Sequence, residues 1–171
     1  MSDISYLDLI DRHTPGPRDD VSPLFANGEA FAAAVSDLAT RCESLRFDVI
    51  AAIDALGFAL GAALAFRAGC GLILVRKAEK LPVRALRETF TDYTGEAKAL
   101  ELRVDLLRVG ARVLVVDEWI ETGAQVLAAI KLIERAQGAV VGVACIHADD
   151  KEGPRILASR YPLISLSGLS S

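Results

Sequence analysis

The chain has 171 residues, of which 52% are hydrophobic and 25% are charged, and this balance predicts one globular domain over residues 1–171. Its formal net charge of −4 argues against a nucleic-acid partner that would need a broad basic surface. The first residues form neither a cationic nor an apolar leader, and the longest apolar stretch, residues 55–66, is too short to cross a bilayer, so we expect no signal peptide and no membrane partner.

The N-terminal part of the chain is predicted to be helix, loop and helix. Residues 1–10 are typical of a short amphipathic helix with Ile4, Leu7 and Leu9 facing inward. Prolines and a glycine mark residues 13–23 as a loop. Asn27 can then cap a helix that runs to about Leu45, because apolar side chains recur along it at helical spacing.

The rest of the chain alternates between short apolar runs and helical patterns. Residues 78–96 are polar and are expected to be irregular, and residues 97–107 alternate like an edge strand. Buried strands are predicted at residues 47–53, 72–75, 112–117, 140–146 and 162–166, and helices at residues 57–68 and 125–136.

Apolar strands separated by helices predict a mostly parallel sheet covered on both faces. Ligands of such sheets bind beyond the carboxyl ends of the strands. The predicted strand ends carry polar residues, namely Asp54 to Gly57, Arg76-Lys77, Asp117-Glu118 and His147.

Thr122 and Gly123 follow one of these strand ends and open a helix. Backbone N–H groups at a helix N-terminus attract phosphate, and the preceding acids Asp117 and Glu118 can hold ribose hydroxyls directly or through Mg²⁺ and water. The chain has neither a Walker loop nor a Gly-x-Gly-x-x-Gly fingerprint. The pattern therefore predicts a sugar-phosphate site of another kind.

The three cysteines, Cys42, Cys70 and Cys145, are far apart and have no Cys-x-x-Cys or histidine pattern. We expect them to be small buried apolar residues in a reducing cytoplasm rather than zinc ligands or disulfides.

Residues 113–125, an apolar strand, two acids and a Thr-Gly turn, resemble the 5-phosphoribosyl-1-pyrophosphate (PRPP) motif of type I phosphoribosyltransferases. The resemblance extends over about residues 15–166, and the adenine-specific branch of that family is the most similar. Other stretches that resemble it in order and spacing are residues 20–24, 58–65, 75–82 and 100–102.

The resemblance implies an α/β fold of the type I phosphoribosyltransferases, with a central, mostly parallel sheet, flanking helices, a small hood and a flexible lid loop. It implies a cytoplasmic, Mg²⁺-dependent homodimer that condenses a purine base with PRPP in purine salvage. The products would be a nucleoside monophosphate and pyrophosphate. Chemistry of this kind depends mainly on orientation, departure of pyrophosphate and charge stabilisation.

The resemblance also assigns expected roles to the strand-end residues. PRPP is expected to bind Asp117, Glu118, Thr122, Gly123, Ala124 and Gln125, with Asp117 and Glu118 holding metal through water. Pyrophosphate is expected to meet Asp54, Ala55, Leu56, Gly57, Arg76, Lys77 and Lys80.

The base and the catalytic groups are placed in the same way. Trp119, Ile120 and Arg18 are expected beside the base, although Trp119 could equally fill the core. The catalytic residues would be Glu121, Asp92 and Tyr93, the last two in the lid. Glu121 is either a general base for a ring nitrogen or a carboxylate stabilised by the helix dipole, and both interpretations stay open.

Two departures from the family pattern favour a second hypothesis. Leu56 stands where adenine-specific enzymes have an arginine, and Gln125 replaces a hydroxyl residue. Loss of a charge-assisted contact costs roughly 1.5–3 kcal/mol. The alternative is therefore a PRPP- or nucleotide-binding regulatory protein of the same fold with weak or no turnover.

Overall fold

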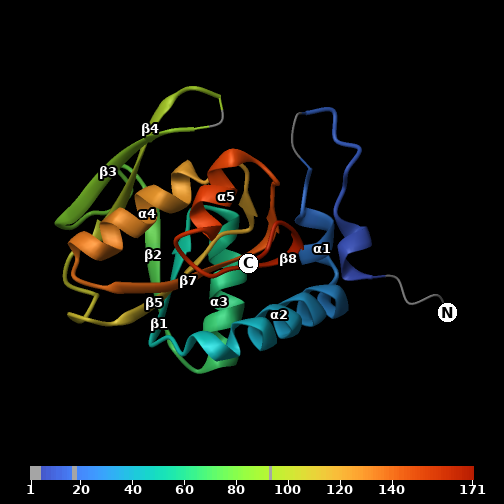
Figure 1. The fold of residues 1–171 in the computed structure, drawn as a ribbon, viewed down its shortest axis with the longest axis horizontal. Coiled ribbons are helices and arrows are strands. Elements are labelled where there is room, and N and C mark those ends of the chain that lie inside the picture. The colour runs from blue at the N-terminus through green and yellow to red at the C-terminus, as the bar shows by residue number, and fades with distance from the viewer. Residues whose placement is uncertain (1–4, 17–18, 93) are drawn as a thin grey trace.

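The computed structural model describes residues 5–16, 19–92 and 94–171, and in these ranges it is an α/β fold with a central sheet between helices (Figure 1). The sheet order is β3-β4-β2-β1-β5-β7-β6, and β8 pairs with the other side of β7. The strands are β1 (Val49–Ile53), β2 (Gly71–Lys77), β3 (Ala85–Thr91), β4 (Ala97–Arg103), β5 (Arg112–Val116), β6 (Trp119–Ile120), β7 (Ala139–Ala148) and β8 (Leu163–Gly168).

The helices divide between the two faces of the sheet. Alternate residues of the central strands point to opposite sides, so that Val113 and Val115 join one apolar cluster while Leu114 and Val116 join the other. The first face is covered by α4 (Ala124–Arg135) and α5 (Glu152–Ala158). The second is covered by η1 (Tyr6–Leu9), α1 (Ser22–Ala26), α2 (Gly28–Cys42), η2 (Glu43–Leu45) and α3 (Leu56–Ala68).

The predicted parallel core is confirmed. Strands β1, β2, β5, β7 and β8 run parallel, and β6 pairs parallel with β7. The Asn27 cap is also confirmed, because its side chain accepts a hydrogen bond from the N–H of Ala30 at 3.0 Å. Of the expected inward residues of the first helix, Leu7 and Leu9 are partly buried around η1, and Ile4 lies outside the described residues.

Two predictions for the middle of the chain are wrong. Residues 78–96 are not irregular throughout, because they contain β3, which forms an antiparallel hairpin with β4. Strand β4 is not an edge strand, since β3 lies outside it. The alternating polar side chains of β3 hid the strand, because only one of its faces packs against the protein.

Three smaller elements were not predicted from the sequence either. Helix α1 begins inside the predicted loop, with Pro23 in its first turn, where a missing N–H costs nothing. Strand β6 and helix α5 have too few residues to show a period. Cys42 and Cys145 are buried, as expected, whereas Cys70 is partly exposed, and all three are free thiols.

None of the helices in the described ranges is long and apolar enough to span a membrane. The antiparallel hairpin joins the parallel sheet through two residue pairs, Arg76 with Glu101 and Lys77 with Leu100, and the N–H of Ala78 also donates to the carbonyl oxygen of Ala99 at 2.9 Å. Both pairs lie at the carboxyl end of β2. The hairpin therefore stands beside the strand ends where the polar residues gather.

Candidate functional site

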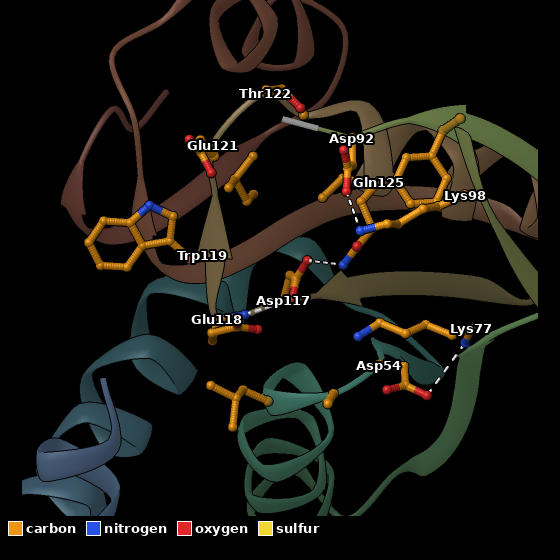
Figure 2. Close-up of a pocket in the computed structure, with 16 residues that line it drawn as sticks. Asp54, Lys77, Asp92, Lys98, Asp117, Glu118, Trp119, Glu121, Thr122 and Gln125 are labelled. Carbon is orange, nitrogen blue, oxygen red and sulfur yellow. Dashed lines mark hydrogen bonds and ion pairs between the residues drawn. The ribbon is translucent and has the colours of Figure 1, made fainter. Parts of the chain in front are cut away.

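A cavity of about 360 Å³ lies beyond the carboxyl ends of β1, β2 and β5, as the parallel sheet predicts (Figure 2). Its volume falls within the roughly 300–1,000 Å³ of small-molecule sites. It is lined by residues from four segments: Asp54, Ala55 and Leu56 after β1; Lys77 on β2; Phe90, Asp92 and Lys98 of the hairpin; and Asp117 to Gly123, Gln125 and Val126.

Asp117 forms the floor of the cavity and is almost wholly buried, with 3% of its surface exposed. It accepts hydrogen bonds from the backbone N–H of Glu118 at 3.0 Å and from Nε2 of Gln125 at 3.1 Å. Burial, and next the neighbouring charge of Glu118, raise the pKa of Asp117 well above its usual value. The hydrogen bond from Gln125 acts in the opposite direction and lowers the pKa of Asp117, but the effect of burial is larger.

The Thr122-Gly123 turn leads directly into α4, as predicted. Gly123 has a φ of 73°, a conformation that favours glycine, and the N–H of Ala124 lies 3.4 Å from the Thr122 hydroxyl. The turn rests on α5, because a Cβ at Gly153 would lie 1.8 Å from the carbonyl oxygen of Thr122. Ala124 itself lies outside the cavity lining.

The loop after β1 closes the opposite wall. Asp54 approaches Arg76 Nε at 3.8 Å and accepts a hydrogen bond from the N–H of Lys77 at 3.4 Å, and its peptide bond to Ala55 is cis. Gly57 does not line the cavity, but a Cβ there would lie 3.0 Å from Asp117 Oδ1. A glycine at this position therefore lets α3 start directly against the buried acid.

The three expected pyrophosphate cations do not all line the cavity. Lys77 lines the cavity, and its side chain points into it in Figure 2. Arg76 and Lys80 belong to the same stretch but lie outside the lining; Arg76 donates a 3.4 Å hydrogen bond to the carbonyl oxygen of Lys80. Lys98, which the sequence analysis did not single out, supplies a second cation from the hairpin.

The tip of the hairpin is held together by Asp92. Its Oδ1 accepts hydrogen bonds from the N–H and hydroxyl of Thr94 at 2.8 and 2.6 Å, and Oδ2 pairs with Lys98. The ion pair with Lys98, followed by the bonds from Thr94, lowers the pKa of Asp92. Asp92 lines the cavity, whereas Tyr93, its predicted catalytic neighbour, lies outside the described residues.

The other end of the cavity is acidic and aromatic. Trp119 lies there, far from the two lysines, with Glu118 and Glu121 beside it (Figure 2). Glu121 comes within 3.6 Å of Lys151 Nζ. Ile120 borders the cavity but is 1% exposed and packs in the apolar cluster under α4 and α5.

A second cavity of about 140 Å³ adjoins this end. It shares Leu56, Glu118 and Trp119 with the first cavity and adds Asp19, Asp20 and Val21 from the N-terminal segment. Arg18, expected beside the base, lies outside the described residues.

Phe90 and Val126 also line the cavity, although the sequence did not predict them there. Phe90 belongs to the strand that was not predicted. Val126 was hidden among the apolar residues of a helix, where only its place in the first turn after Thr122-Gly123 could have pointed to the cavity.

Comparisons with known proteins agree with this architecture. The family described as "Phosphoribosyl transferase domain" matches residues 25–167. Adenine phosphoribosyltransferase of Chromohalobacter salexigens is 43% identical over 127 residues, 74% of this chain and 70% of that protein. The protein of the same name from Thermosipho melanesiensis is 38% identical over 147 residues, 86% of this chain and 83% of the relative.

Solved structures give the same result. The crystal structure of adenine phosphoribosyltransferase from Thermoanaerobacter pseudethanolicus superposes with a TM-score of 0.88 at 31% identity, and the match covers 96% of this chain and 98% of that one.

Proposed function

This chain belongs to the phosphoribosyltransferase family, and we propose that it condenses adenine with PRPP to give adenosine monophosphate and pyrophosphate, a step of purine salvage. The observation that carries the proposal is one cavity that joins the Thr122-Gly123 turn, the Asp117-Glu118 acids, two lysines and an aromatic wall. These are the groups that a phosphorylated ribose, a pyrophosphate and a flat base would each require.

In this reaction a ring nitrogen of the base forms a bond to C1′ of the ribose while the bond from C1′ to the pyrophosphate oxygen breaks. Positive charge develops on the sugar, and negative charge leaves with pyrophosphate. Lys77 and Lys98 lie where they can stabilise the leaving group, and the turn that begins α4 can hold the 5′-phosphate. Asp117 and Glu118 accept hydrogen bonds from the ribose hydroxyls.

The base is assigned to the Trp119 end of the cavity. An indole ring offers a flat apolar face against which a purine can stack. Glu121 lines the same end and can exchange a proton with a ring nitrogen as a general base. Adenine is the base named for the relatives in Chromohalobacter salexigens and Thermosipho melanesiensis, at 43% and 38% identity.

The donor set suits Mg²⁺. Within the described ranges no three His, Cys, Asp or Glu side chains form a metal-binding group, and Asp117 and Glu118 offer carboxylate oxygens only. Mg²⁺ is commonly bound by one or two carboxylates together with substrate phosphates. Bound there, the ion would neutralise charge on the departing pyrophosphate, while Asp117 and Glu118 would hold it through water.

A homodimer and a cytoplasmic location are further parts of this proposal, and both rest on the family resemblance. Light scattering of the purified protein tests the first. A molar mass near 18.2 kDa, the mass of one chain, would reject the dimer.

The decisive experiment is a panel of adenine, hypoxanthine, guanine and xanthine, each with PRPP and Mg²⁺. We expect pyrophosphate release with adenine and the appearance of adenosine monophosphate. Turnover of another base alone would refute the base assignment, and no turnover with any of the four would refute the enzyme proposal. Omission of Mg²⁺, with a chelator present, should abolish the reaction.

A further inference from the structure

Trp119 is a structural boundary between the two cavities. With Leu56 and Glu118 it lines both of them, so this residue borders the space proposed for substrate. The side chain stacks on His147, with ring centroids 4.1 Å apart and an interplanar angle of 28°. The indole therefore has a stacking partner on one of its faces.

Asp149 holds the polar edge of the same indole. Its Oδ1 accepts a hydrogen bond from Trp119 Nε1 at 3.0 Å and lies 3.3 Å from Nε2 of His147. Its Oδ2 pairs with Lys151 Nζ at 2.7 Å. The side chains of His147 and Asp149 are 16% and 18% exposed, so these contacts are largely shielded from solvent.

The contacts rest on strand pairing rather than on mobile loops. Trp119 on β6 is the direct register partner of His147 on β7, and the N–H of Asp149 donates to the carbonyl oxygen of Ile120 at 2.9 Å. Nδ1 of His147 lies 2.8 Å from the Ser167 hydroxyl on β8. Three neighbouring segments thus set the position of the imidazole and the carboxylate.

We propose that Asp149 and His147 are positioning residues that fix the Trp119 ring as the wall of the base site and so set the affinity for the base. An indole has two side-chain torsions, and a stacking partner together with a hydrogen bond at Nε1 restrains both. A wall that is already ordered before the base arrives saves the entropy of ordering it on binding. The substrate part of this inference rests on the proposed function, whereas the restraint on the ring does not.

The kinetic test compares Asp149→Ala with Asp150→Ala. Asp150 is the adjacent aspartate, 61% exposed and paired with Arg155, and it serves as the matched control. We expect Asp149→Ala to raise the KM for adenine roughly three- to ten-fold and to leave the KM for PRPP within about two-fold. Asp150→Ala should change neither, and Asp149→Asn, which keeps an acceptor for Nε1, should restore most of the adenine affinity.

A double-mutant cycle shows whether Asp149 acts through the indole. In a Trp119→Phe background the N–H is absent, so adding Asp149→Ala should have no further effect on the KM for adenine. An equal effect in both backgrounds, or equal changes in the KM for adenine and for PRPP, would overturn the inference.

Fluorescence tests the restraint without any substrate, because Trp119 is the single tryptophan of the chain. In ligand-free Asp149→Ala the emission should shift to longer wavelength, and acrylamide should quench it faster than in the Asp150→Ala control. Unchanged emission and quenching would overturn the restraint even if the enzyme is active. If no base is turned over, the proposed function fails, and the fluorescence still decides whether Asp149 holds the ring.

Discussion

The two ends of the cavity are built in different ways. At one end Lys77 and Lys98 project from strands into open space, and Lys98 remains 44% exposed although it pairs with Asp92. At the other end Trp119, His147 and Asp149 are linked by stacking and hydrogen bonds across paired strands. The first end suits a flexible, highly charged ligand held by charge, whereas the second suits a flat ligand held by shape.

The largest expected effect lies at the lysine end. Lys77→Met should lower kcat/KM for PRPP about 10- to 100-fold, since a lost charge-assisted contact costs roughly 1.5–3 kcal/mol. Lys80→Met is the matched control, because Lys80 belongs to the same stretch but lies outside the lining. Steady-state kinetics of both variants measures the difference. Equal losses in the two variants would contradict a direct contact between Lys77 and PRPP.

The next effect concerns the turn that joins the two ends. Gly153→Ala places a Cβ 1.8 Å from the carbonyl oxygen of Thr122, so α5 and the turn must move apart. We expect a loss of about 1–3 kcal/mol in the free energy of unfolding and a weaker affinity for PRPP. In Gly28→Ala the new Cβ meets nothing within 4 Å, which makes it the control. Urea unfolding of both variants would contradict the contact if their stabilities fell equally.

Charge on the cavity floor gives a smaller, pH-dependent effect. Burial raises the pKa of Asp117, so the acid limb of the activity profile should lie above the pKa of 3.8 of an ordinary aspartate. Gln125→Ala removes a donor that stabilises the ionised form, and the limb should move further upward. For folding, a raised pKa means that the stability contributed by protonated Asp117 is lost as pH rises through the folded-state pKa.

The profile of kcat/KM for PRPP against pH measures this shift. The pKa of Asp92 shifts in the opposite direction, because its ion pair with Lys98 lowers it. The stability that ionised Asp92 contributes is therefore lost as pH falls through its folded-state pKa. An acid limb that stays in place in Gln125→Ala would show that Asp117 does not set it.

The smallest expected effect is on the hairpin that carries Lys98. Glu88 accepts hydrogen bonds from Lys131 at 3.1 Å and Arg135 at 3.0 Å, and it is 19% exposed. Glu88→Gln should cost up to about 1 kcal/mol and speed hydrogen exchange in β3. Glu79→Gln, whose contact with Arg87 is 3.9 Å long and far more exposed, should leave exchange unchanged. Equal exchange in both variants would show that Glu88 does not hold the hairpin.

A difference in burial between strands explains how much of the fold the sequence could predict. The apolar runs of β1, β5 and β7 are buried on both faces, so composition alone indicates them. Strand β3 exposes alternate side chains and is defined by its pairing with β4, which composition does not specify. Parallel order and the place of the site followed from the βαβ pattern.

For the site, local sequence was sufficient only where neighbours in the chain act together. The acid pair and the Thr122-Gly123 turn form one short loop, and the structure places both against the cavity. The bond from Trp119 to Asp149 spans 30 positions and arises from the register of β6 and β7. Likewise, Lys98 rather than Lys80 lines the cavity because a hairpin folds over it, which the residue spacing does not reveal.

Helix α4 links two parts of the site, and this link matters for engineering. Its first turn follows the Thr122-Gly123 loop, while Lys131 and Arg135 near its end hold Glu88 of the hairpin, about 15 Å further along the axis. A substitution that tilts α4 would displace both parts of the site, so changes on this helix should be strongly epistatic with changes in the hairpin. Libraries that aim at a new base can therefore vary the N-terminal segment around Asp19 and Val21 and keep α4 constant.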